Sequence, residues 1–260
     1  MELSTNQRGF GVAAAIPAEL IAPLAKAAEQ AGYSTFWVND TPGSDGIQAL
    51  QLAAAETSNI RLAVGVIPLD RRSPAAIAKR VQKANLPIER LVIGIGAGGA
   101  QMGSLDLVER GIVEIQELTG SRVVVGALGM KMIGLAGELA DGVILNWLTP
   151  QWAKQSVEVA RGFDRPEPIE IIGYVRTAVE ESRTRLELEA DRYASFPAYA
   201  RHFRRMGVPA IETCATGSSE LIATSLTACD AVFDETVVRA IVVAETLDSY
   251  LAVLHAGRPA

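Results

Sequence analysis

The chain has 260 residues and a formal net charge of −6, because 24 lysines and arginines stand against 30 acidic residues. This acidic balance argues against general binding to nucleic acid or to anionic membranes, either of which needs a basic surface. The composition, 49% hydrophobic and 21% charged, is that of a globular protein with a sizeable core. Only two histidines are present, His202 and His255, so we expect no histidine-rich metal site and no bound metal.

The cysteines and the N-terminal segment bear on the cellular compartment. Cys214 and Cys229 lack the CxxC spacing of a zinc or redox site, and we expect both to be reduced thiols. The first residues, MELSTNQRGFGVAAAIP, contain an apolar stretch that is too short for a membrane span or a signal peptide. The sequence therefore predicts a cytoplasmic protein.

Short apolar, β-branched runs alternate with alanine-rich helical patterns along the chain. Eight strands are predicted, at residues 9–15, 34–38, 60–66, 90–95, 121–126, 142–146, 169–176 and 236–243. Helices are predicted at 18–31, about 46–57, 74–84, 105–119, 130–140, about 150–161 and 246–255, with a long helical stretch that Pro197 interrupts and Gly207 ends. The segment SSELIATSL predicts one extra helix before the last strand.

These eight strand–helix units take about 32 residues each, which is the length of the repeating unit in a (β/α)8 TIM barrel. The strands are continuously apolar, as in a parallel sheet that helices cover. A doubly wound open sheet would show the same alternation, but eight units favour closure. No linker divides the chain, so we expect a single domain over residues 1–260.

In such a barrel the active site lies at the C-terminal ends of the strands, so the loops that follow the strands are the places to search. Asp40, after the second strand, is a candidate catalytic acid or base, and capping of the following turn is the alternative. Arg71 and Arg72, after the third strand, either hold an anionic ligand or form a surface ion pair beside Asp70.

The fourth loop, GIGAGGAQMG, contains Gly96 and Gly98 and matches G-x-G-x-x-G literally. A dinucleotide fingerprint belongs to the first strand of its unit and leads directly into a helix, and neither condition holds here. Three interpretations stay open: a dinucleotide site, a glycine-rich loop that lets a cofactor approach the backbone, or a plain turn.

The fifth loop is suited to an anion. Gly129 leaves the backbone open, and the amides of Met130 and Lys131 begin a helix whose positive dipole end favours negative charge. Asn146 and Thr149 on the next loop either donate to the same anion or cap their own helix. The ends of the seventh and eighth strands are expected to repel phosphate, because both carry carboxylates: Glu180, Glu181, Glu245 and Asp248.

The aromatic residues and one histidine have two interpretations each. Trp147, at the end of the sixth strand, lines the pocket or belongs to the core, whereas Trp37 is assigned to the core. His202 lies in the basic segment YARHFRRMG, and we expect it on a solvated helix face. Three further aromatic residues either form a flap over the pocket or simply pack within the helical region: Tyr193, Phe196 and Tyr199.

Four segments resemble the bacterial luciferase-like monooxygenases, and within them the branch that uses the deazaflavin coenzyme F420: AEQAGYSTFWVND, IRLAVGVIPLDRRSPAAIAKRV, ERLVIGIGAG and ALGMKMIGLAGELADGVILNW. The resemblance implies a TIM barrel with the ring at its mouth, backed by a bulge in the third strand and a non-prolyl cis peptide at Gly65-Val66. It implies a cofactor phosphate at Leu128, Gly129 and Met130. The full set of cofactor-binding residues that we predict is Val64, Gly65, Val66, Ile67, Gly96, Gly98, Ala127, Leu128, Gly129, Met130, Asn146, Trp147 and Thr149.

Two positions differ from similar proteins. Thr41 stands where many relatives have a histidine beside the ring, and Gly99 stands where deazaflavin sugar-phosphate dehydrogenases carry a glutamate. Sugar-phosphate oxidation is therefore doubtful for this chain.

The resemblance leads to three hypotheses about function. The first is an oxidoreductase that transfers a hydride between reduced coenzyme F420 and a small organic substrate. The second is an FMN-dependent monooxygenase that acts with molecular oxygen, and the third is a non-catalytic flavin-binding barrel. In each case we expect a homodimer with a small-molecule partner and no nucleic-acid or membrane partner.

Overall fold

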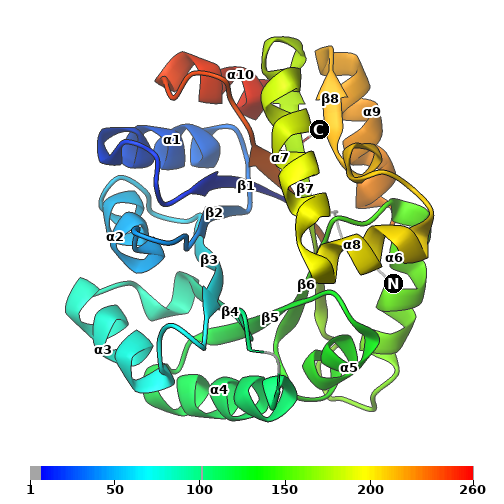
Figure 1. The fold of residues 1–260 in the computed structure, drawn as a ribbon. Helices are drawn as coiled ribbons and strands as arrows, with labels where there is room; N and C mark the ends of the chain where they lie inside the picture. The colour runs from blue at the N-terminus through cyan, green and yellow to red at the C-terminus, as the bar shows by residue number, and fades with distance from the viewer. Residues whose placement is uncertain (1–6, 101, 260) are drawn as a thin grey trace.

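The computed structural model describes residues 7–100 and 102–259. Among these residues, eight parallel strands form a closed barrel that helices surround (Figure 1). The barrel strands are β1 (Gln7–Ala13), β2 (Thr35–Asn39), β3 (Arg61–Pro68), β4 (Leu91–Gly96), β5 (Arg122–Ala127), β6 (Gly142–Asn146), β7 (Glu170–Val179) and β9 (Glu235–Ala240). The helices are α1 (Ala18–Gln30), α2 (Gly46–Ala55), α3 (Pro74–Ala84), α4 (Ser104–Thr119), α5 (Met130–Leu139), α6 (Pro150–Arg161), α7 (Arg183–Ser195), α8 (Pro197–Met206), α9 (Ser219–Asp230) and α10 (Leu247–Ala256).

The barrel closes through β7 and β9. Strand β7 pairs with β6 on one side and with β9 on the other, and β9 pairs with β1. Strands β1 to β6 are hydrogen-bonded each to the next, in parallel register. The predicted TIM barrel is therefore confirmed, because a doubly wound sheet would leave its two edge strands unpaired.

The C-terminal third departs most from a simple alternation. The predicted break at Pro197 is confirmed, since α7 ends at Ser195 and proline occupies the first position of α8, where its missing N–H leaves no bond unmade. The predicted extra helix is α9, and a short unpredicted strand, β8 (Ala215–Gly217), precedes it. The prediction that the last strand reaches residue 243 is wrong: β9 stops at Ala240, because β7 pairs with β8 from Thr177 onward.

Strand β3 is irregular at the position that the resemblance implied. Its register with β4 shifts between Val64 and Ile67, and the peptide bond Gly65-Val66 is cis, so both the bulge and the cis bond are confirmed. Gly94 of β4 makes room for this bulge, because a Cβ atom there would collide with the carbonyl oxygen of Val64. Side chains from neighbouring strands fill the rest of the barrel: Trp37, Ala63, Val92, Val124, Ile144, Ile172, Tyr174 and Val237.

A polar network closes the N-terminal end of the barrel. Glu235, the first residue of β9, is fully buried and receives hydrogen bonds from Arg61 Nη2 at 2.8 Å and Trp37 Nε1 at 3.1 Å. Arg61 also donates to Glu170 Oε1 at 2.9 Å. Burial raises the pKa of Glu235 above its ordinary value, although Arg61 works in the opposite direction. The network joins the first residues of β3, β7 and β9 and closes the N-terminal end of the barrel.

The structure bears on two sequence predictions, one about membrane spans and one about the cysteines. The described part of the chain contains no helix that combines the length and the apolarity of a membrane span. Cys214 and Cys229 are both free thiols. Burial raises the pKa of Cys229 to about 12, so this side chain is a protonated, unreactive part of the packing.

Candidate active site

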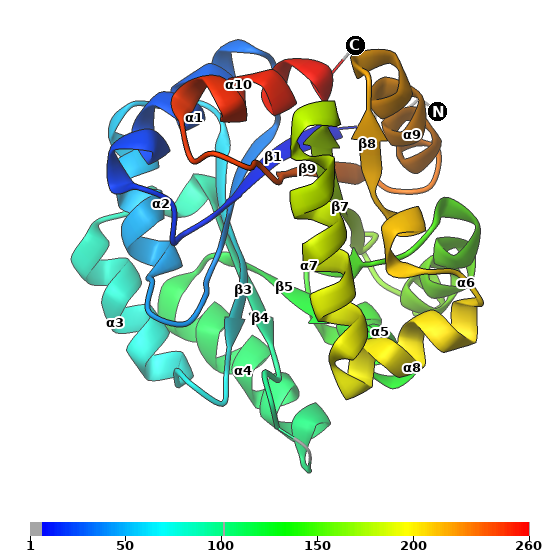
Figure 2. The same cartoon turned by 45° about the horizontal axis from the view of Figure 1, so that its top comes forward.

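A cavity of about 800 Å³ opens at the C-terminal ends of the barrel strands. Helix α7 lies in front of β7, and α8 continues from it (Figure 2). Side chains of α7 and α8 form one wall, and the strand ends form the other. The wall and floor include the following polar, glycine and aromatic residues, together with Val66: Asn39, Asp40, Gly65, Asn146, Arg176, Glu189, Tyr193 and Arg239.

Gly65 and Val66 form the part of the floor where the ring was predicted. Asn39, at the end of β2, donates its amide Nδ2 to the carbonyl oxygen of Gly65. The amide oxygen of Asn39 accepts from the Arg239 Nε at 2.6 Å and from the Tyr174 hydroxyl at 3.1 Å. Burial raises the pKa of Tyr174 to about 12, so the hydroxyl keeps its proton and donates it in this bond. One amide side chain therefore connects three strands beside the cis peptide.

Arg176, on β7, occupies the opposite side of the floor. Its guanidinium donates to Glu189 Oε1 and to Asn146 Oδ1, both at 2.7 Å. It also lies 3.8 Å from the ring centre of Trp147 and 4.5 Å from that of Tyr193. Burial alone would raise the pKa of Glu189, but the positive charge of Arg176 brings it below its ordinary value, so the pair is ionised.

The loop after β6 only partly fulfils its predicted role. Asn146 lines the cavity, but its amide oxygen is bound to Arg176. Thr149 caps α6 by accepting from the Trp152 amide at 3.4 Å, which is the capping alternative. The pocket-lining interpretation of Trp147 is wrong, since the side chain is 2% exposed and packs behind Arg176 against Phe203. Its indole N–H has no hydrogen-bond partner among the described residues.

Asp40 lines the cavity, but its carboxylate oxygens interact with neighbouring groups of the protein. One oxygen accepts from the Gly46 amide at 3.1 Å and from Arg72 at 3.0 Å, and the other lies 3.7 Å from Arg71. This arrangement corresponds to the capping alternative. The surface pair expected for Arg71 and Arg72 thus forms with Asp40 rather than with the adjacent Asp70.

The glycine-rich loop after β4 is a turn that Asp70 stabilises. The Asp70 carboxylate accepts from the Gly99 amide at 2.8 Å, and Gly98 adopts a φ of +65° where a Cβ would collide with that carboxylate. Neither Gly96 nor Gly98 lines the cavity at the barrel mouth. Gly96 lies behind Val66, whose side chain a Cβ on Gly96 would contact at 3.2 Å. The turn interpretation therefore describes this loop best.

The fifth loop keeps the features of an anion site. Gly129 is the N-cap of α5 and offers no side-chain hydrogen bond to the first amides of the helix. A Cβ on Gly129 would meet no atom within 4 Å, so the space in front of these amides is open. Arg205 of α8 reaches the carbonyl oxygen of Leu128 at 3.5 Å, which brings a cation to the same loop. Sequence reasoning did not place this arginine at the loop, because α8 is remote from the loop along the chain.

The remaining predicted residues fall into two groups. Val64, Ile67 and Ala127 are buried in the layer between strands and helices, behind the floor of the cavity. Tyr193, Phe196 and Tyr199 combine both alternatives, because Tyr193 makes edge-to-face contacts with the other two rings and all three line the cavity.

The expectation for His202 is wrong. Its side chain is 4% exposed, and Nε2 forms a hydrogen bond of 2.8 Å with the carbonyl oxygen of Trp147. The reason is that α8 packs its apolar face against the loop after β6, which buries His202 between Phe203 and that loop. Burial lowers the pKa of His202, so the ring is neutral near pH 7.

Arg176 and Arg239 are two further site residues that sequence reasoning missed. Both lie in predicted strands, IEIIGYVR and TVVRAIVV, whose other members are mostly apolar. A charged residue within such a run is the signal that could have been used, because an inward-facing charge needs a partner or a ligand. These arginines also correct the expectation that carboxylates dominate the ends of the last two barrel strands.

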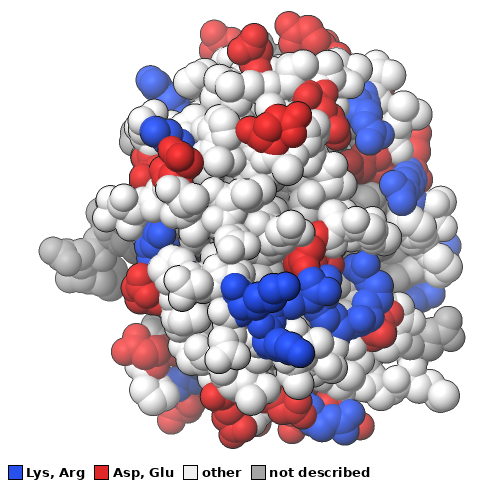
Figure 3. All heavy atoms as spheres, turned by 90° about the vertical axis from the view of Figure 1, so that its left-hand side faces the viewer, with Lys and Arg blue, Asp and Glu red and all other residues white. Residues whose placement is uncertain are grey.

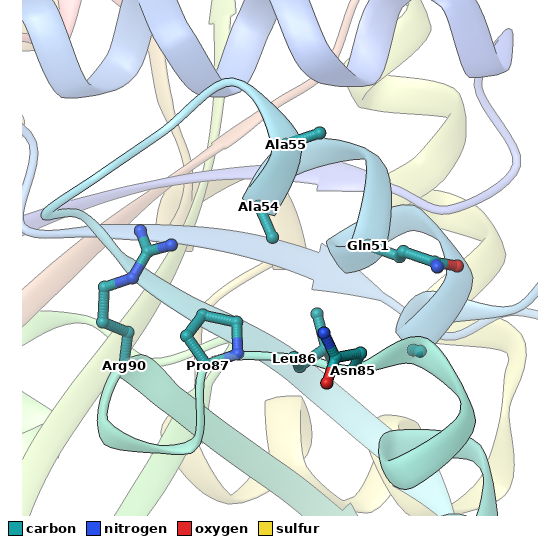
Figure 4. A pocket seen from close by; sticks show the side chains of 8 residues that line it. Gln51, Ala54, Ala55, Asn85, Leu86, Pro87 and Arg90 are labelled. Carbon is teal, nitrogen blue, oxygen red and sulfur yellow. The ribbon is translucent and has the colours of Figure 1, made fainter.

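Two other depressions of the surface are weaker candidates for an active site. One, of about 800 Å³, lies beside the patch of lysines and arginines on the side covered by α1, α2 and α3 (Figure 3), and Arg72 and Arg80 there are paired with Asp45. The other, of about 510 Å³, lies between the ends of α2 and α3, near the N-terminal end of the barrel (Figure 4). Its one charged side chain, Arg90, donates to the carbonyl oxygens of Thr57 and Ile60.

Comparison with known proteins gives one family and one fold. The family described as luciferase-like monooxygenase matches residues 2–104. The 5,10-methylenetetrahydromethanopterin reductase of Methanolobus tindarius is 24% identical over 220 residues, which are 69% of this chain and 68% of the reductase.

Two solved structures share the whole architecture. An F420-dependent secondary alcohol dehydrogenase in complex with an F420-acetone adduct superposes with a TM-score of 0.75 at 15% identity, over 98% of this chain and 99% of the other. The oxygenating constituent of 3,6-diketocamphane monooxygenase from Pseudomonas putida, in complex with FMN, has a TM-score of 0.68 at 12% identity, over 97% and 98% of the two chains. At these identities the likeness establishes the fold.

Proposed function

We propose that this member of the luciferase-like monooxygenase superfamily is an oxidoreductase that transfers a hydride between the deazaflavin ring of coenzyme F420 and a small organic substrate. The observation that carries the proposal is the cavity at the barrel mouth, whose floor contains Gly65 and Val66. The sequence likeness to a putative coenzyme F420-dependent oxidoreductase of Mycobacterium tuberculosis, 33% identical over 94 residues, which are 36% of this chain, favours the deazaflavin over other rings.

The residues present fit a ring with a phosphate-bearing tail. Val66 offers an apolar surface and Asn39 a polar edge beside it, both in the cavity. Outside the lining of this cavity, the uncapped amides at the start of α5 and the guanidinium of Arg205 suit a phosphate group. The open space in front of Gly129 leaves room for that group.

When bound, the ring would supply the redox chemistry by accepting or donating a hydride. The part of this chain is to bind, orient and exclude water. The aromatic wall of Tyr193, Phe196 and Tyr199 shields the cavity on the side of α7 and α8. Asn39 is fixed by Tyr174 and Arg239, so it holds one orientation beside the floor. We assign Asp40 a positioning role, because its oxygens already serve Gly46 and Arg72.

The test is a pair of titrations of the purified protein, one with oxidised F420 and one with FMN, followed by ring fluorescence and thermal shift. We expect saturable binding of F420 at concentrations where FMN gives no change. Binding of FMN together with oxygen uptake on reduction would favour the monooxygenase alternative instead. If neither ring binds, the proposal fails, and F420 binding without turnover of any electrophilic substrate would favour a non-catalytic barrel.

A further inference from the structure

The arginines of the strands differ in whether a carboxylate accompanies them. The described strands contain five arginines, and four of them form ion pairs with distances of 2.7–2.9 Å: Arg8 with Asp230, Arg61 with Glu170 and Glu235, Arg122 with Glu170, and Arg176 with Glu189. The fifth, Arg239 of β9, pairs with none of the carboxylates in the described ranges.

Arg239 is half-buried in the floor of the cavity. Its Nε donates to the neutral amide oxygen of Asn39 at 2.6 Å, and its Nη1 donates to the carbonyl oxygen of Ala240. Its Nη2 has no hydrogen-bond partner within residues 7–100 and 102–259. The guanidinium is therefore held in place from one side and keeps free donor capacity on the other.

The carboxylates around the cavity do not form an ion pair with Arg239. Asp40 is paired with Arg72, and Glu189, which also interacts electrostatically with Arg239, is hydrogen-bonded to Arg176. Glu245, which is exposed, stands alone against Arg239 and two further lining arginines on α7, Arg185 and Arg192. The cavity therefore has an excess of positive charge that a bound anion would neutralise.

A half-buried guanidinium without an ion-pair partner is unfavourable, because it has lost part of its hydration and no carboxylate is bound to it. A carboxylate matches its planar donors in shape and can accept two parallel hydrogen bonds. Since Asn39 joins Arg239 to the carbonyl oxygen of Gly65, an anion bound there would lie beside the floor at Gly65 and Val66.

We propose that the substrate of this cavity is a small carboxylate, and that Arg239 binds its anionic group. The inference about substrate rests on the proposed function, but the anion site can be tested by binding alone. Because Arg239 lies beside Gly65 and Val66 in the same cavity, the carboxylate and a bound ring would occupy neighbouring positions at the same time.

The experiment compares benzoate with benzamide, which have nearly the same shape and differ in charge. Isothermal titration calorimetry is carried out on the protein alone and on the protein loaded with F420. We expect benzoate to bind at least about 10-fold more tightly than benzamide, as for a charge-assisted pair in place of a neutral one. Arg239→Gln should abolish this preference, and Arg239→Lys should retain part of it.

Two further variants control the interpretation. Arg161→Gln removes an arginine from the outer surface, where it pairs with Asp234, and should leave the preference unchanged. Asn39→Asp places a carboxylate against Arg239 Nε and should abolish the preference while the arginine stays. Far-ultraviolet circular dichroism confirms that each variant is folded.

Equal affinities for the two probes, or a preference that survives Arg239→Gln, would overturn the inference. Mutual exclusion of benzoate and F420 would also overturn it, because the anion position would then belong to the cofactor. If F420 binds but the benzoate preference is absent, only this inference fails. If the preference is present and F420 does not bind, the anion site stands and the proposed redox function fails.

Discussion

The two ends of the barrel differ in how fully their buried charges are matched. At the N-terminal end, Arg61 is surrounded by Glu170 and Glu235, so each charged group faces an opposite charge. At the C-terminal end, Arg176 is paired with Glu189, but Arg239 donates its hydrogen bonds to neutral oxygens and faces a cavity of about 800 Å³. Both ends belong to the same closed sheet, and both place an arginine from a strand beside a partner from another strand.

This contrast shows which end serves stability and which is available for binding. Matched and hydrogen-bonded charges in a closed network fix the strands, and removing one partner leaves the other buried without compensation. An unmatched charge beside a cavity lowers stability slightly and creates affinity for a ligand. Substitutions made at one end at a time can therefore separate an effect on stability from an effect on binding.

The largest effect is expected at the closed end. Arg61→Met leaves Glu235 and Glu170 without their shared cation and should lower the free energy of unfolding by about 3 kcal/mol, measured by urea unfolding at pH 7. Arg122→Gln is the matched control, because this exposed arginine also pairs with Glu170 and should cost less than about 1 kcal/mol. Equal losses in both variants would contradict the assignment. Affinity for F420 should be unchanged in either variant.

The second effect concerns the open end. Gly129→Asp places a negative charge in front of the first amides of α5 and should lower F420 affinity about 100-fold or more, since it occupies the predicted phosphate site. The free energy of unfolding should not fall, because φ at Gly129 is −106° and the space around it is open. Gly129→Ala, which adds only a methyl group, should bind nearly as the parent does. Retained affinity in Gly129→Asp would refute the phosphate placement.

A third prediction uses the buried carboxylate at the closed end. Burial raises the pKa of Glu235 in the folded state above its unfolded value of about 4.3. A raised pKa contributes stability below pH 4.3 that is lost as the pH rises through the folded pKa. Glu235→Gln removes this pH-dependent contribution. The free energy of unfolding of the variant, measured by urea unfolding and compared with that of the parent, should therefore increase from pH 4 to pH 8. A difference that does not change with pH would show that Glu235 titrates as an ordinary glutamate.

The smallest expected effect lies behind the open end. Burial lowers the pKa of His202 below about 6.5, so the unfolded chain takes up a proton more readily than the folded one. The stability due to the neutral ring is therefore present above pH 6.5 and is lost as the pH falls through the folded pKa. As the pH falls from 7 to 5, the free energy of unfolding should decrease less in His202→Gln than in the parent protein. The exposed His255→Gln is the control, and identical curves for His202→Gln and the parent would contradict this assignment.

Much of the fold could be predicted because its signals are local. The alternation of apolar strands and helices indicated the barrel, and Pro197 marked the boundary between α7 and α8. The capping pair Ser73-Pro74 began α3 as predicted, with the Ser73 hydroxyl accepting from the Ala76 amide. The bulge at Gly65-Val66 came from family resemblance alone, since nothing in the local sequence requires it.

The site was less predictable, because its polar groups find partners across the barrel. Asp40 and Thr149 were identified by their place after a strand, yet their side chains satisfy their own turns. His202 looked solvated from its basic neighbours, but the packing of α8 buried it. Arg205 came to the loop after β5 from a helix 77 residues away along the chain.

By itself, the sequence determined the order of strands and helices, the closure into a barrel and the loops where a site had to lie, because these depend on periodicity and on local capping. Only the tertiary structure decided which arginine received a counterion. Arg176 meets Glu189, 13 residues away, whereas Arg239 meets the neutral Asn39, 200 residues away. Closure of the sheet brings those partners together, and the charge left unmatched by it is what makes one end of the barrel a binding site.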